Sequence, residues 1–120
     1  MDTPTTELTV EQRAEEKAIE LAKQLGVYKV YPILFKDMQT GDDVIGFLKH
    51  PPRIVQQRVM DKALQGATSA SAELLEVILI KEASDERIYS ENPAYDYINN
   101  GAVMAAYDII KAAVNQFKKK

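Results

Sequence analysis

The chain has 120 residues, with no cysteine, no tryptophan and a single histidine, His50. The lack of cysteine excludes disulfide bonds and thiolate–metal sites. A lone histidine has no second histidine with which to share a metal, and no serine in a nucleophile-elbow context lies near it. The glycines are isolated from one another, which excludes a glycine-rich phosphate loop. We therefore expect a protein that is not an enzyme and holds neither a metal nor a cofactor.

Long apolar runs and a basic surface are also missing. The longest strongly apolar stretch, Leu74–Ile80, is interrupted by Glu76 and is too short to cross a bilayer. Met1–Thr9 is polar and acidic, unlike a signal peptide. The net charge is −3, whereas a nucleic-acid-binding protein needs a basic face. These features predict a soluble cytoplasmic protein that binds neither membranes nor nucleic acid.

One globular domain over residues 9–120 is expected after a flexible tail at residues 1–8. Thr9 and Gln12 fit a capping box, and Gly26 lies where a left-handed C-terminal cap is expected. They predict a first helix between Thr9 and Gly26, whose apolar stripe is mostly alanine. The stripe consists of Ala14, Ala18, Leu21, Ala22 and Leu25.

A β-hairpin is expected next, because Val27–Lys36 and Val44–Lys49 are rich in β-branched and aromatic residues and flank a turn-forming segment. Pro32 cannot donate to a ladder, which indicates an edge strand or a bulge. A lone hairpin is marginal in water, so it must pack on helices or pair with another chain.

Helices are expected over most of the remaining chain. The first of these helices is predicted over Arg53–Gln65, directly after two prolines. Ala67–Ser71 is interpreted as a linker that also supplies the N-cap of the next helix. Ala72–Ala83 is apolar almost all round, which favours a core helix but leaves a strand as an alternative. The buried side of the Arg53–Gln65 helix is predicted to consist of Ile54, Val55, Val59, Ala63 and Leu64. The fold class is thus α+β, dominated by helices.

The last helix pattern, Ala94–Lys118, has two apolar faces, although Asn99–Gly101 can delay its start. The first face is Ile98, Gly101, Ala105, Ile109, Ala112 and Ala113. The second is Val103, Tyr107, Ile110, Val114 and Phe117. A helix with two apolar faces either lies inside the core or uses one face for a partner. Both alternatives stay open from the sequence.

The ionisable residues carry ordinary structural interpretations. Asp42-Asp43 lacks the alternating oxygen ligands of a calcium loop and is predicted to be a solvated turn. The acids between Glu82 and Glu91 form pairs of the kind any acidic connector offers by chance. His50, beside two prolines, is expected to be a satisfied or solvent-facing loop residue.

One run of the sequence resembles a known family. Ile45-Gly46-Phe47-Leu48-Lys49-His50-Pro51-Pro52-Arg53 leads from a hairpin into a helix. A Glu73-Leu74-Leu75 helix and an acidic segment, Glu82–Ile88, follow. This order resembles the small tail assembly chaperones of tailed bacteriophages, over roughly residues 28–90. Ile80-Lys81-Glu82 stands where those relatives often have Cys-Trp.

The resemblance implies a binding protein that holds apolar helices of the tape-measure protein while tail-tube subunits assemble. The second face of the last helix is the first candidate surface, with Tyr107, Ile110, Val114 and Phe117. The hairpin edge is the second candidate, with Val30, Ile33 and Phe35, because an unpaired edge can recruit a strand.

Two other functions are alternatives, of which only the first fits the size and charge. The first is a structural or connector subunit that stays in the virion and packs in homo-oligomeric rings. The second is a small nucleic-acid-binding regulator, which the acidic balance disfavours; Arg53–Lys62 carries only Arg53, Arg58 and Lys62 as basic residues.

Overall fold

A computed structural model describes residues 9–63 and 65–118, and the surroundings of their side chains except at 67 and 112–118. The elements are α1 (Val10–Leu25), β1 (Val30–Lys36), β2 (Asp43–Lys49), α2 (Arg53–Ala63), α3 (Ala67–Ile78) and α4 (Asp96–Lys118). Three short 3-10 helices connect α3 to α4: η1 (Lys81–Ala83), η2 (Glu86–Ile88) and η3 (Pro93–Tyr95). The predicted α+β class, with four helices and one antiparallel hairpin, is confirmed.

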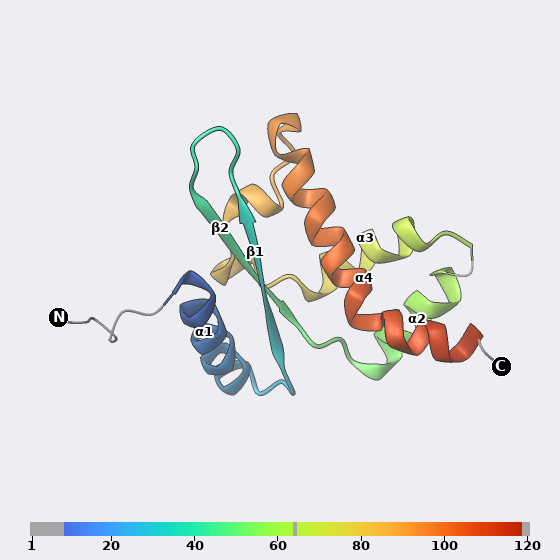
Figure 1. Cartoon of the computed structure of the whole chain (residues 1–120). Helices are drawn as coiled ribbons and strands as arrows, with labels where there is room; N and C mark the ends of the chain where they lie inside the picture. The colour runs from blue at the N-terminus through green and yellow to red at the C-terminus, as the bar shows by residue number, and fades with distance from the viewer. Residues whose placement is uncertain (1–8, 64, 119–120) are drawn as a thin grey trace.

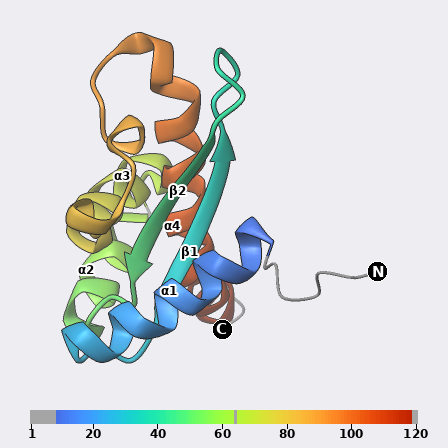
Figure 2. The same ribbon diagram turned by 90° about the vertical axis from the view of Figure 1, so that its left-hand side faces the viewer.

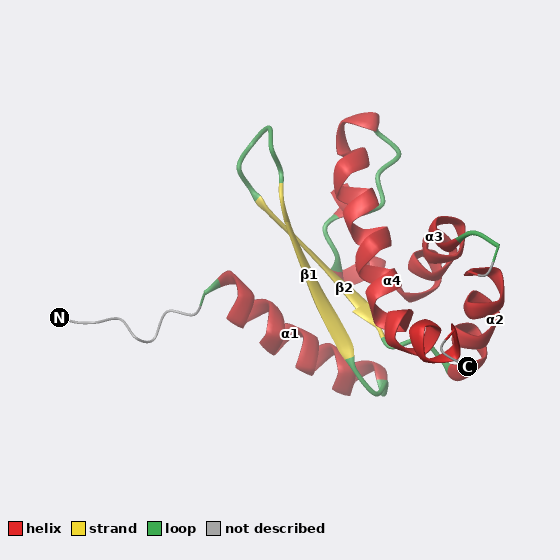
Figure 3. Cartoon of the chain, turned by 45° about the vertical axis from the view of Figure 1, so that its right-hand side comes forward, coloured by secondary structure: helices red, strands yellow, loops and turns green. Residues whose placement is uncertain are grey.

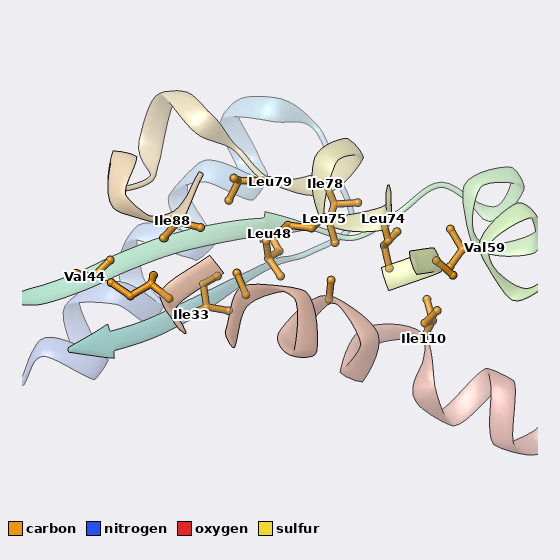
Figure 4. Close-up of a cluster of buried hydrophobic side chains, with 14 residues drawn as sticks. Ile33, Val44, Leu48, Val59, Leu74, Leu75, Ile78, Leu79, Ile88 and Ile110 are labelled. Atoms are coloured by element: carbon orange, nitrogen blue, oxygen red, sulfur yellow. The ribbon is translucent and has the colours of Figure 1, made fainter. Parts of the chain in front are cut away.

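The hairpin lies between two helical layers (Figures 1 and 2). Because side chains alternate along a strand, one face of the hairpin meets α3 and α4 and the other meets α1. The main core includes Ile33, Val44, Leu48, Leu74, Leu75, Ile78, Ile88, Ile98 and Ile110 (Figure 4). The smaller core consists of Ala18, Leu21, Val30, Phe47 and Ile80. Burial on both faces is what stabilises a sheet of only two strands.

Helix α1 forms as its sequence predicts. The hydroxyl of Thr9 accepts from the backbone N–H of Gln12, and the Gln12 side chain accepts from the backbone N–H of Thr9. Gly26 ends the helix at φ 68°, in the left-handed region that glycine adopts without strain. The predicted stripe is buried at Ala14, Ala18 and Leu21, while Leu25 is about half exposed.

The outer edge of β2 is covered by the chain that follows α3. Leu79 forms an antiparallel bridge with Leu48, and the N–H of Ile80 donates to the carbonyl of Phe47. Further along, the N–H of Asp85 donates to the carbonyl of Ile45. The segment predicted as helix up to Ala83 is therefore α-helical only as far as Ile78, and the residues after it contact β2 through an isolated bridge without forming a strand.

Two other predictions about the helices are wrong, and one is confirmed. Ala67–Ser71 is the first turn of α3 and not a linker, because Gly66 supplies the extended residue before it. Ile54, predicted to be on the buried side of α2, is 68% exposed, whereas Val59 is buried as predicted. Leu64 lies outside the described residues. The last helix agrees with its prediction, because α4 continues through Asn99–Gly101 and the alternative of a later start does not hold.

Gly101 has a packing role in α4. A Cβ at this position would lie 2.6 Å from Cε1 of Phe35, so the ring of Phe35 on β1 rests directly against the helix backbone. This close approach explains why a glycine is accommodated inside a helix despite its conformational entropy cost.

Candidate protein-binding groove

One stripe of α4 faces the core. Ile98, Ala102, Ala106 and Ile110 recur every four residues and are all buried. Such spacing places them along one side of the helix. Helix α4 packs against α3, and Figures 1 and 3 show the two helices next to each other. The next residues round the helix are left at the surface beside the start of α3.

These residues border a groove of about 400 Å³ between α3 and α4. Its lining residues are Thr68, Ser71, Asn100, Val103, Met104, Tyr107, Asp108 and Lys111. The apolar lining comes from α4, where Met104 is 70% exposed and Val103 and Tyr107 are partly buried. Since a helix rises 1.5 Å per residue, Asn100 and Lys111 lie about 16 Å apart along α4. That length matches about three turns of a partner helix.

The predicted second face of α4 is only partly at this groove. Tyr107 and Val103 line it. Ile110 is 1% exposed and packs in the main core, so the interpretation of this residue as a partner contact is wrong for the folded chain. Val114 and Phe117 lie outside the residues whose side chains the structure describes.

Met104 was absent from both predicted faces. It lies three residues before Tyr107 and is among the most exposed large apolar side chains of the described chain. The signal that could have found it is this spacing, because residues three apart share a helix face. A flexible methionine suits a surface that adapts to apolar partners.

The predicted hairpin edge is less open than the sequence indicated. Val30 and Ile33 are buried in the two cores, and Phe35 is partly buried against Gly101. The backbone of β1 could still pair with another strand. Whether it can do so depends on which of its N–H groups point away from β2.

Alternate residues of β1 direct their N–H groups outward. The bonds from Asp37 N–H to Asp42 and from His50 N–H to Lys29 fix the ladder, so the odd-numbered residues of β1 bond to β2. Pro32 therefore occupies an outward position, where its missing N–H leaves β2 unaffected but interrupts the free edge. The structure gives little support to strand addition here.

A charged cluster fastens the hairpin tip to η2. The Asp37 side chain, 1% exposed, accepts from Nη1 of Arg87 at 2.8 Å and from the backbone N–H of Gln39. Arg87 also binds Asp85 through two nitrogen atoms and lies 3.3 Å from Asp42. The hydrogen bond from Arg87 is the main cause that holds the pKa of Asp37 below its usual value. The pKa of Arg87 is raised, chiefly by its hydrogen bonds to Asp85 and Asp37.

Arg87→Gln is expected to destabilise the chain more at pH 7 than in acid. A carboxyl group whose pKa is lowered on folding stabilises the fold above its unfolded-state pKa, near 3.9, and loses that contribution as the pH falls through its folded-state pKa. The difference between wild type and variant should therefore shrink below about pH 4. Urea unfolding at pH 7, 4 and 2.5 measures it, and a difference that is constant with pH would contradict an electrostatic role.

His50 is a satisfied residue, as predicted. Its Nδ1 lies 2.7 Å from Oη of Tyr31, and its ring makes a T-shaped contact with the Tyr28 ring. Within residues 9–63 and 65–118, no three His, Asp or Glu side chains gather as a metal-binding group. No helix in that part of the chain is long and apolar enough to cross a membrane.

Comparison of the chain with protein-family models, with curated proteins and with solved structures finds no match. The groove between α3 and α4 is therefore interpreted from its own residues and geometry.

Proposed function

We propose that the chain is a non-enzymatic assembly protein of a tailed bacteriophage that holds an apolar helix of the tape-measure protein in the α3–α4 groove. The observation that carries the proposal is the row of Val103, Met104 and Tyr107 beside an open groove. Methionine and tyrosine are residue types enriched at protein interfaces, where they fill pockets on a partner.

The charge of the chain supports a chaperone role. A net charge of −3 keeps copies apart in solution while one apolar surface shields a partner. Asp108 and Lys111 flank Tyr107 at the groove, so its rim carries both signs of charge. An amphipathic partner helix can lay its apolar face on α4 and keep its polar face in water. The complex would form in the host cytoplasm before the tail is complete.

Size-exclusion chromatography with light scattering tests this proposal, first on the chain alone and then after co-expression with phage tail proteins. A monomer or dimer that gains mass with the tape-measure protein, and raises its soluble yield, is the expected result. A stable ring of many copies would contradict the proposal and favour a connector subunit. A chain that neither binds nor solubilises the tape-measure protein would also overturn it.

A further inference from the structure

The positive charges of the chain are unevenly distributed. Two stretches, residues 21–36 and 44–60, contain no aspartate and no glutamate. Their lysine and arginine residues are Lys23, Lys29, Lys36, Lys49, Arg53 and Arg58. The net charge of −3, from which the sequence predicted no binding of nucleic acid, is an average that conceals this separation of charge.

Folding brings four of these cations to one end of the hairpin, which we call the basic end. Lys49 is the last residue of β2, and the N–H of His50 after it donates to the carbonyl of Lys29. Lys23 and Lys29 both line a hollow of about 320 Å³ between α1 and β1. Arg53 begins α2, three residues after His50. These segments meet at the lower end of the hairpin in Figure 2.

The cations of the basic end are not neutralised by neighbouring carboxylates. Across residues 9–63 and 65–118, the ion pairs of lysine and arginine involve Lys36, Lys62 and Arg87. Glu15 also lines the hollow, but it forms no ion pair with Lys23 or Lys29. The N-terminus of α2 adds the partial positive charge of its free backbone N–H groups. An anionic partner would therefore meet cations whose charge is still available.

Aromatic rings lie among these cations. Tyr28 is 82% exposed, the highest value among the large apolar side chains of the described residues. Its ring makes a T-shaped contact with the ring of His50, with 5.0 Å between the two centroids. Nζ of Lys29 lies 5.1 Å from the centre of the Tyr31 ring. An exposed tyrosine ring between cations offers a surface on which a planar group can stack.

We propose that the basic end of the hairpin binds a short stretch of single-stranded nucleic acid. Its lysine and arginine side chains contact the phosphates while a base stacks on Tyr28, the combination with which proteins bind single strands without sequence preference. An acidic peptide would also meet the cations, but it would leave the ring of Tyr28 without a stacking partner. Asp42 and Asp43 at the opposite end of the hairpin repel phosphates, which limits the site to a few nucleotides.

Fluorescence anisotropy of a labelled oligothymidine of about twelve nucleotides, titrated with the chain, tests the site. Contacts with about three phosphates predict a slope near −2 for the logarithm of affinity against the logarithm of salt concentration. A tenfold increase in salt should therefore weaken binding about a hundredfold. Absence of binding at low salt, or binding that salt does not weaken, would overturn the proposal.

Matched variants locate the contacts. Tyr28→Ala should weaken binding at least about fivefold and leave the salt slope unchanged, because it removes stacking and no charge. Lys29→Gln should weaken binding and reduce the size of the slope by about 0.7. Lys36→Gln is the control, because it removes the same charge at the other end of β1, where Lys36 pairs with Asp43. Equal losses for the two lysine variants would contradict the site.

A polyglutamate peptide of similar length distinguishes nucleic acid from an acidic protein partner. It should bind more weakly than the oligothymidine, and Tyr28→Ala should not change its affinity. Equal affinity for the two probes would overturn the proposal in favour of an acidic protein partner, and stronger binding to anionic vesicles would overturn it in favour of a membrane surface. These measurements use the chain alone, so their outcome is independent of the α3–α4 groove.

Discussion

Leu48→Ala is expected to lower the free energy of unfolding by about 2–5 kcal/mol. Leu48 is fully buried on β2, faces the main core, and forms the bridge that brings Leu79 against the sheet. Its truncation leaves a cavity where the hairpin meets α3. Equilibrium unfolding in urea, followed by circular dichroism, measures the loss.

Ile54→Ala is the matched control for this substitution. Ile54 is 68% exposed on α2, so removal of its side chain should change the free energy of unfolding by less than about 0.5 kcal/mol. Losses of similar size at Leu48 and Ile54 would contradict the described core.

Met104→Asp is expected to weaken binding of an apolar tape-measure helix at least tenfold. The side chain of Met104 stands at the groove, where a bound helix would cover it. A carboxylate placed there would lose its water on binding without gaining a partner, which costs more than 1.4 kcal/mol, the equivalent of a tenfold change. Fluorescence anisotropy with a labelled peptide from the tape-measure protein measures the affinity.

Met38→Asp provides the matched control. Met38 is 78% exposed at the hairpin tip, away from the groove, so the same change of residue should leave the affinity unaltered. Equal losses for the two variants would indicate a non-specific effect of charge and would count against the groove.

Local signals in the sequence predicted the parts of the fold that local interactions determine. Thr9 and Gly26 set the ends of α1 through bonds within a few residues. The hairpin strands were predicted from their composition, although β1 begins at Val30 and not at Val27. Pro32 correctly indicated an edge position.

Tertiary contacts decided what the local pattern left open. Leu79 and Ile80 continue an apolar run, yet they leave α3 because the free edge of β2 accepts their backbone groups. Gly101 indicated a possible break in the helix, but the helix continues there and its backbone packs against Phe35. These two residues are 66 positions apart in the sequence, so no local pattern could predict their contact.

The candidate site was predicted only in part for the same reason. Tyr107 was correctly predicted to lie on an apolar face of α4. The same predicted face also contained Ile110, which instead belongs to the buried stripe with Ala102 and Ala106. Alanines give a weak signal for burial, so the stripe was hard to locate. The ion pair of Asp37 and Arg87 joins residues 50 apart in the sequence and has no local signature.

Isothermal titration of a tape-measure helix into the chain tests the central proposal most directly. We predict that one helix binds per chain and that the binding enthalpy becomes more negative as the temperature rises, the signature of buried apolar surface. We also predict that the Met104→Asp chain shows the loss of affinity described above. Absence of binding by the wild-type chain, or equal affinity in the variant, would contradict a helix-binding role for the α3–α4 groove.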